Sequence, residues 1–531
     1  MSGASDANMA TDDKMNGAQA LLRTLVDGGV DVCFANPGTS EMHFVAALDA
    51  VPEMRAVLAL FEGVVTGAAD GYGRMADKPA ATLLHLGPGM ANGLANLHNA
   101  RRAHTPIVNV IGDHARYHKG FDAPLESDID ALTGWVHGWS RTSKTSEEVG
   151  ADAAAAIAAA MQPPGQQANL VLPADVSWSE GGVVGEQVTP AGAMPVDDAR
   201  VGEIAKIVRG GESTVLLLGH GTTREAGLVA ASRIAAATGV KLFAETFPAR
   251  IERGAGLPAV ERLGYLAEQV QWQLTDVKHL VLVGAKAPVS FFAYPGKASE
   301  LVPDGCHVHV LSVLGEDGTG ALENLADLVV ADTKPVLQEA VRPALPTGAL
   351  TPQNWTEVIG ALLPEGAIVS DEANTSGLMI PMTTAGAPRH DVLTITGGAI
   401  GQGLPVATGA AIASPDRPVV CLQADGSAMY TASALWTMAR EGLNVTTVLL
   451  NNRAYAILRM ELSRVGAEAS GPKAAELLDL STPDLDFVQL SQGMGVPASR
   501  ATTAEELAEQ FAKALAEPGP HLIEAMVPPL L

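Results

Sequence analysis

Short apolar runs alternate with alanine-rich stretches along most of the chain. The runs lack the strict apolar–polar alternation of a strand with one face in water, so they predict strands that are buried on both faces. Because segments of helical composition separate them, the pattern predicts an α/β fold of doubly wound parallel sheets. The predicted strands are Val30–Phe34, Ala56–Phe61, Ala81–Leu84, Pro106–Ile111, Asn169–Val171, Thr214–Leu218, His279–Val283, His307–Leu311, Ala367–Ser370, Pro418–Gln423, Val445–Leu450 and His521–Met526.

Two polar, proline-containing stretches divide the chain into three parts. Gly185–Ala199 and Arg342–Gln353 show no hydrophobic periodicity and are typical of linkers. The sequence therefore predicts three doubly wound domains, and the residues up to about 13 are expected to form a loose tail. The predicted domains cover residues 14–184, 200–337 and 352–531.

Composition and charge exclude several classes of protein. With 47% hydrophobic and 18% charged residues over 531 positions, the chain is not intrinsically disordered. A net charge of −25 disfavours binding to nucleic acid or to an anionic membrane. No apolar run reaches the roughly 18 residues of a membrane-spanning helix, and the polar N-terminus lacks the pattern of a signal peptide. Three widely separated cysteines, Cys33, Cys306 and Cys421, fit a reducing compartment, so we expect a cytoplasmic protein.

The most informative segment joins two predicted strands of the third part. The first strand ends at Ala424-Asp425-Gly426-Ser427, before a predicted helix over about 431–441, and the next strand ends at Asn451-Asn452. Parallel strands deliver their last residues to one edge of the sheet, so Asp425 and Asn452 are expected to lie side by side. A carboxylate and an amide oxygen suit a hard cation such as Mg²⁺, and the amides beside Ser427 suit an anion. The structural alternative is that Asp-Gly forms a turn and Asn-Asn a strand exit.

This segment resembles the signature of thiamine-diphosphate-dependent enzymes, in which Gly-Asp-Gly is followed about two dozen residues later by Asn-Asn. Here Ala424 replaces the first glycine. The resemblance implies that Asp425 and Asn452 bind Mg²⁺ together with the backbone carbonyl of Ala454. It also implies that Gly426 and Ser427 contact the cofactor.

Two further segments of the third part match the same family. Thr394–Pro405 is a glycine-rich turn before an alanine-rich helix, which alone indicates only close packing. It resembles the family's loop with one bulky apolar residue, which implies that Ala399 and Ile400 contact the cofactor and that Ile400 supports its bent form. The residues that fit the family's diphosphate-holding position are Asn374, Thr375 and Ser376.

Glu62 ends an apolar predicted strand in the first part and precedes a helical run of small residues. On this pattern alone, an exposed helix-start glutamate and an acid that faces a cleft stay equally open. The segment from Glu62-Gly63 to Ala69-Asp-Gly-Tyr-Gly-Arg74 resembles the pyrimidine-binding signature of the acetolactate synthase and benzoylformate decarboxylase group. The resemblance implies that Glu62 hydrogen-bonds the aminopyrimidine ring and sets the tautomer that activates the cofactor.

Two more strand ends of the first part resemble this group. Asn36–Glu41 is similar to the Asn-Pro-Gly-Ser-x-Glu turn of benzoylformate decarboxylases, with Thr39 at the position of their active-site serine. An ordinary helix cap is the alternative. His85 falls where those enzymes have an active-site histidine, whereas the Gly-Pro-Gly that follows it matches acetolactate synthases. An imidazole at this place can protonate the alkoxide formed on carbonyl addition.

The resemblance covers roughly residues 15–530 and implies a carbon–carbon lyase or transferase. Such an enzyme uses thiamine diphosphate and Mg²⁺ to act on a 2-oxo acid by decarboxylation, carboligation or both, as acetolactate synthases do. A benzoylformate-type decarboxylase without ligase activity and a catalytically idle cofactor-binding relative stay open. In this family different subunits hold the two ends of the cofactor, which implies a homodimer or homotetramer with active sites at the subunit interface.

The middle part contains Gly219-His-Gly221-Thr-Thr-Arg224 after a predicted strand. This segment resembles a dinucleotide fingerprint in which arginine replaces the third glycine. A nicotinamide or flavin oxidoreductase is therefore a weaker alternative. Acetolactate synthases bind FAD in this part, but their FAD-holding segments have no match here, so FAD is expected to be absent.

Overall fold

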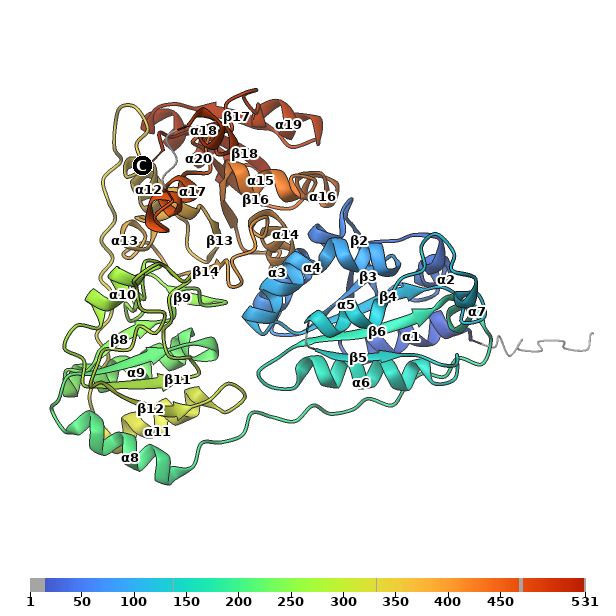
Figure 1. Cartoon of the computed structure of the whole chain (residues 1–531), viewed down its shortest axis with the longest axis horizontal. Coiled ribbons are helices and arrows are strands. Elements are labelled where there is room, and N and C mark those ends of the chain that lie inside the picture. The colour runs from blue at the N-terminus through green and yellow to red at the C-terminus, as the bar shows by residue number, and fades with distance from the viewer. Residues whose placement is uncertain (1–14, 137, 331, 468–470, 530–531) are drawn as a thin grey trace, which may run out of the picture.

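A computed structural model of the chain describes residues 15–136, 138–330, 332–467 and 471–529, and the predicted N-terminal tail lies outside these residues. The described chain forms three sheets flanked by helices, which confirms the predicted α/β class (Figure 1). The boundaries of the three domains stay a prediction. Among the described residues, none of the helices combines the length and the hydropathy that crossing a bilayer requires.

The first sheet has six parallel strands in the order β2-β1-β3-β4-β6-β5. Each predicted strand of this region is present, and the structure adds β5, an edge strand without an apolar run. The strands are β1 (Val32–Asn36), β2 (Arg55–Leu58), β3 (Ala80–Leu84), β4 (Ile107–Asp113), β5 (Trp139–Thr142) and β6 (Gln167–Pro173). The helices are α1 (Gly17–Asp27), η1 (Thr39–Glu41), α2 (Met42–Ala47), η2 (Leu48–Ala50), α3 (Glu62–Ala76), α4 (Leu86–Ala103), η3 (Lys119–Phe121), α5 (Ile129–Val136), α6 (Val149–Met161) and α7 (Ala174–Trp178).

The middle sheet has five parallel strands in the order β10-β8-β7-β11-β12. Its central strands β7 and β11 have the bounds that the sequence predicts. The strands are β7 (Thr214–Leu218), β8 (Lys241–Ala244), β10 (Glu261–Arg262), β11 (His279–Val283) and β12 (His307–Ser312). The helices are α8 (Asp198–Arg209), η4 (His220–Thr223), α9 (Glu225–Thr238), α10 (Ala267–Gln273) and α11 (Gly318–Val330).

The third sheet has the order β17-β18-β16-β15-β13-β14-β9, and its neighbouring strands are parallel except for β9 against β14. The strands are β9 (Ile251–Arg253), β13 (Ala367–Glu372), β14 (His390–Thr394), β15 (Val419–Ala424), β16 (Val445–Asn451), β17 (Ala498–Ala501) and β18 (His521–Met526). The helices are α12 (Asn354–Leu362), η5 (Asn374–Gly377), α13 (Ile380–Thr383), α14 (Gly403–Ala413), α15 (Asp425–Thr431), α16 (Ala434–Glu441), α17 (Ala456–Arg464), α18 (Pro472–Leu477), α19 (Phe487–Gly493) and α20 (Ala504–Ala516).

Strand β9 belongs to the segment predicted as the middle domain, yet it forms an antiparallel edge of the third sheet. The sequence did not predict it because three residues are too short to show a hydrophobic pattern. Its pairing with β14 joins the middle and third parts of the chain through backbone hydrogen bonds.

Two predicted elements next to the site have different bounds in the structure. The helix expected over 431–441 starts at Asp425 and is divided into α15 and α16. It starts there because β15 ends at Ala424, and the Asp425 carboxylate accepts a hydrogen bond from the amide of Gly426 (2.8 Å). The strand predicted to reach Phe61 ends at Leu58, and Glu62 is the first residue of α3.

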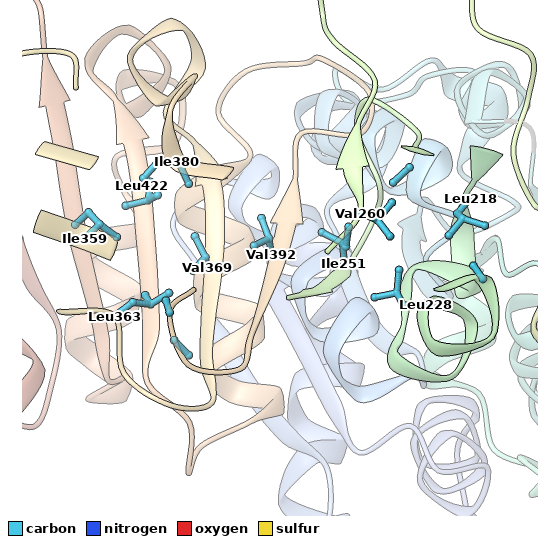
Figure 2. Close-up of a cluster of buried hydrophobic side chains, with 14 of the residues drawn as sticks. Leu218, Leu228, Ile251, Val260, Ile359, Leu363, Val369, Ile380, Val392 and Leu422 are labelled. Carbon is cyan, nitrogen blue, oxygen red and sulfur yellow. The ribbon is translucent and has the colours of Figure 1, made fainter. Parts of the chain in front are cut away.

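Two hydrophobic cores cross between the parts of the chain. In one, Val64 and Ala68 of α3 lie in the same buried cluster as Val406 and Ala410 of α14. Figure 1 shows α3 and α4 turned toward α14. The other core runs from the middle sheet through Ile251 into the third sheet (Figure 2). Because separating these parts would expose buried apolar surface, the first core holds the first part against the third, and the second core holds the middle part against the third.

Candidate active site

Asp425 and Asn452 lie side by side at the carboxyl edge of the third sheet, as the topology predicts. Oδ2 of Asp425 accepts hydrogen bonds from the amides of Asn452 (3.0 Å) and Arg453 (2.7 Å). Both Asp425 and Asn452 are buried. Burial raises the pKa of the Asp425 carboxyl, and the surrounding backbone N–H donors oppose that rise.

The oxygen atoms at this edge suit a hard divalent cation. They come from one carboxylate, the amide side chain of Asn452 and the backbone of Ala454, whose N–H donates to Oδ1 of Asn452 (3.0 Å). Within the described residues, no three or more His, Cys, Asp or Glu side chains gather as they do in a protein-only metal site. A cation here would therefore take its remaining ligands from water and from a phosphate, which is how Mg²⁺ is usually bound.

The segment with Asn374, Thr375 and Ser376 forms the short helix η5 directly after β13. η5 lies against β15 and α17, which are the elements next to Asp425 and Asn452. Ser376 is buried, and its carbonyl accepts a hydrogen bond from the Trp355 indole (3.1 Å). The structure thus places the predicted diphosphate residues beside the predicted cation site.

Glu372 connects this edge to the glycine-rich loop. Its buried carboxylate accepts hydrogen bonds from the amides of Gly401 (2.7 Å) and Gly403 (2.6 Å), on the carboxyl side of Ile400. Gln423 donates to the same carboxylate (3.0 Å) and to the hydroxyl of Ser427 (2.6 Å). Burial raises the pKa of Glu372, whereas the donors around it lower that pKa. Glu372 was missed as a functional candidate, although it is the last residue of the buried strand β13.

Glu62 begins α3 at the carboxyl edge of the first sheet. The residue is only 5% exposed, which overturns the alternative of a solvated helix-start glutamate. Its Oε2 accepts a hydrogen bond from Nδ2 of Asn92 on α4 (2.9 Å). Asn92 was also missed, because a polar residue inside a helical stretch gives no signal in a single sequence.

His85 follows β3 at the carboxyl edge of the first sheet, where it pairs with Glu41, the second buried acid of this edge. Its Nδ1 lies 2.8 Å from Oε2 of Glu41, which is also buried. A carboxylate only accepts, so Nδ1 is the nitrogen that donates to Glu41. At Gly38 a Cβ would lie 2.2 Å from Nδ1 of His85, so the imidazole fits only beside a glycine.

Thr39 is exposed in η1, and its catalytic role stays a prediction. The hydroxyl oxygen Oγ of the neighbouring Ser40 lies 3.4 Å from Nδ1 of His85. The same hydroxyl donates to Oε1 of Glu41 (2.6 Å). The structure therefore brings Ser40 and Glu41 to the histidine. Glu41 stands in the predicted turn motif, but the motif alone does not assign it a partner.

In the middle part, the first amide of α9, just after the dinucleotide-like segment, already has a partner. α9 begins with Glu225, and the amide of Glu225 donates to the Glu252 carboxylate (2.7 Å). A dinucleotide fold would bind its pyrophosphate at this helix end, which here is held by a carboxylate of the chain itself. The geometry argues against a dinucleotide at α9, and the absence of FAD stays a prediction.

Comparison with known proteins agrees with this arrangement. Residues 15–137 match the family described as "Thiamine pyrophosphate enzyme, N-terminal TPP binding domain", and residues 376–525 match its "C-terminal TPP binding domain". The chain is 62% identical over 519 residues to a Mycobacterium tuberculosis protein named "Putative acetolactate synthase large subunit IlvX", covering 97% of this chain and 100% of that protein.

More distant relatives match along almost the whole chain. Benzoylformate decarboxylase of Pseudomonas aeruginosa is 30% identical over 528 residues, which cover 93% of this chain and 96% of that protein. A solved structure of the thiamine diphosphate-dependent 4-hydroxybenzoylformate decarboxylase of Rhodococcus jostii RHA1 superposes with a TM-score of 0.84 at 25% identity. The superposition covers 97% of this chain and 99% of that one.

Proposed function

Because the chain belongs to the thiamine pyrophosphate enzyme family and is of its acetolactate synthase and benzoylformate decarboxylase type, we propose that it decarboxylates a 2-oxo acid with thiamine diphosphate and Mg²⁺. The observation that carries the proposal is the buried Glu62 carboxyl group, held by Asn92 at the carboxyl edge of the first sheet. An acid fixed in this way can hold a proton on a ring nitrogen of a bound cofactor.

The third sheet's edge would hold the charged end of the cofactor. Asp425, Asn452 and the carbonyl of Ala454 would bind Mg²⁺, and η5 would contact the diphosphate. When bound, thiamine diphosphate supplies a carbanion that adds to the keto carbon of the substrate and takes up the electron pair left when CO₂ departs. Ile400, on the loop that Glu372 holds, would support the cofactor's bent form.

Glu62 would set the protonation state of the cofactor's aminopyrimidine ring. Asn92 donates to Oε2, which restricts rotation of the carboxyl group, and Oε1 would bond to the ring nitrogen. Burial of Glu62 would keep water from competing for its hydrogen bond to the ring nitrogen. Replacing the acid by an amide would keep this shape but remove the proton that Glu62 shares.

His85 would handle protons on the substrate. Glu41 holds the proton on Nδ1, so Nε2 can take up a second proton and later donate it to the oxygen of the former keto group. The Glu41 carboxylate stabilises the imidazolium that forms, as in other carboxylate–histidine pairs.

A second copy of the chain would complete each site. Glu62 and Asp425 lie on edges of different sheets, and one small cofactor needs contacts with both kinds of edge. Exposed apolar side chains surround the third sheet's edge and fit a surface that another protomer covers. They are Met429, Tyr430, Leu458 and Leu477. A homodimer or homotetramer follows from this part of the proposal.

Carboligation is the second candidate outcome, because the 62% identical relative is named as an acetolactate synthase subunit. After CO₂ leaves, a decarboxylase adds a proton to the reacting carbon, whereas a carboligase joins that carbon to a second carbonyl compound. The His85–Glu41 pair supports protonation, because a proton carrier would then stand beside the bound substrate.

The test is a panel of 2-oxo acids that contains pyruvate, benzoylformate, branched-chain and hydroxy variants. CO₂ and ligated product are measured separately with thiamine diphosphate and Mg²⁺ present. We expect at least one acid to release CO₂ with the wild-type protein and not with Glu62→Gln. Ligated product beside CO₂ would assign carboligation. Cofactor binding without CO₂ from any acid would contradict the proposal and favour a catalytically idle relative.

A further inference from the structure

The turn that carries Ile400 is flanked by two glycines in the left-handed region. Gly398 has a φ of +74° and Gly401 a φ of +93°, and only Ala399 and Ile400 lie between them. Glycine reaches many backbone conformations at little steric cost, so such a pair allows a short turn to move as a unit. Ala399 and Ile400 therefore need outside contacts to stay in one position.

Asn99 on α4 provides such a contact from the first part of the chain. Its Nδ2 donates to the carbonyl of Ala399 (2.8 Å), and the Ala399 amide donates back to its Oδ1 (3.1 Å). The side chain thus pairs with Ala399 as a neighbouring peptide group would. Asn99 is completely buried and Ala399 is half-buried, so water has limited access to these two bonds.

The orientation of Asn99 is itself fixed by neighbouring groups. Nδ2 of Asn99 also donates to Oδ1 of Asn96 (3.1 Å), and the hydroxyl of Thr396 donates to the carbonyl of Asn99 (2.7 Å). Asn96 in turn donates to the carbonyl of Gly401 (3.3 Å). With Glu372 bound to the amide of Gly401, both ends of the turn are held.

We infer that Asn99 is a positioning residue, which holds the Ala399–Ile400 turn where Ile400 can support the cofactor. The inference rests on the proposed function, because it gives Ile400 a task only when thiamine diphosphate is bound. Asn92, which holds Glu62, lies on the same helix. An interface asparagine that only stabilises packing is the alternative.

The first experiment needs no cofactor. Amide hydrogen exchange is followed at Ala399 and Gly401 in the wild-type protein, in Asn99→Ala and in Asn109→Ala. Asn109 is a matched control, because it is a fully buried asparagine of the first sheet that bonds to Thr82 and Asn169. We expect Asn99→Ala to speed exchange at Ala399 about tenfold, the effect of one lost hydrogen bond. Equal exchange in the two variants would overturn the inference.

The second experiment adds thiamine diphosphate and Mg²⁺ and measures deuterium exchange at the cofactor's C2 position by NMR after acid quenching. We expect the rate of deuterium exchange at C2 to fall about tenfold in Asn99→Ala, with cofactor affinity nearly unchanged. Asn109→Ala should behave like the wild type.

A third variant, Asn99→Asp, sharpens the amide-exchange experiment without cofactor. It keeps the acceptor for the Ala399 amide, so its amide exchange rate at Ala399 should lie between those of Asn99→Ala and the wild type.

Two results would separate the inference from the proposed function. Faster amide exchange in Asn99→Ala with an unchanged C2 rate would show a structural contact and overturn the positioning role. A wild-type protein that binds no thiamine diphosphate would instead overturn the proposed function, and Asn99 would then be a structural contact whatever its amide exchange.

Discussion

The edges of the first and third sheets hold their acids in different ways. At the carboxyl edge of the third sheet, called the third edge below, Asp425 accepts hydrogen bonds from three backbone amides. They are those of Gly426, Asn452 and Arg453. Backbone donors remain when neighbouring side chains change. The position of Asp425 therefore depends on the course of the chain and little on the identity of its neighbours.

At the first edge, side chains position other side chains. Asn92 holds Glu62, and Glu41 holds His85. One substitution removes such a contact completely and can leave a buried polar atom without a partner. The comparison indicates that binding of the cofactor's charged end is robust, whereas the chemistry at its other end depends on a few pairs of residues.

The largest effect is expected for Glu62→Gln. The amide keeps the shape and the contact with Asn92 but has no acidic proton, so turnover should fall by about 10²–10⁴-fold. Cofactor affinity should stay nearly unchanged, because the third edge is intact. Steady-state kinetics and equilibrium dialysis measure the two quantities. Glu53→Gln, at the exposed amino end of β2, is the control, and an equal loss in both variants would contradict the role of Glu62.

Asp425→Ala should produce the opposite pattern. Removing the carboxylate takes away a cation ligand, and Mg²⁺-dependent binding of thiamine diphosphate should weaken by about 100-fold or more. Equilibrium dialysis with and without Mg²⁺ measures the loss. Asp416→Ala changes an exposed acid at the amino end of the same strand and should bind like the wild type. Unchanged retention in Asp425→Ala would rule out the assigned cation site.

A double-mutant cycle on His85 and Glu41 tests whether the two residues act as one unit. Each of His85→Ala and Glu41→Gln should lower kcat by about 10–100-fold and leave cofactor affinity nearly intact. The double variant should lose little more than His85→Ala alone, because Glu41 acts through the imidazole. Additive losses would show that Glu41 has a separate task, and a large loss of cofactor affinity would mark His85 as structural.

The smallest effect is expected where β9, from the middle part of the chain, pairs with β14 of the third sheet. Burial lowers the pKa of His390, on β14 opposite β9, to about 4. Between its ordinary pKa near 6.5 and about 4, the unfolded chain binds more protons than the folded one, so the fold loses stability as the pH falls. As the pH falls from about 6.5 to about 5, the wild-type protein loses free energy of unfolding. His390→Gln should reduce this loss by about 2 kcal/mol, measured by urea unfolding. His43→Gln, at the surface, should not change it.

The sequence alone determined the features that depend on local patterns and on neighbouring strands. Apolar runs located the central strands, and parallel pairing of β15 with β16 placed Asp425 beside Asn452. Asp425 and Asn452 end consecutive strands of one sheet, so topology decides their meeting without any knowledge of distant packing.

Tertiary structure alone decided which side chains position the site. Asn92 lies 30 positions from Glu62, Glu41 lies 44 from His85, and Asn99 lies 300 from Ala399. These residues stand in helices and turns where one polar residue looks like another, and no periodicity marks a partner. The Asn92 and Asn99 contacts exist because apolar packing holds α3 against both α4 and α14. Glu41 meets His85 because they follow the neighbouring strands β1 and β3. A single sequence shows that such residues are buried but not which residues they contact.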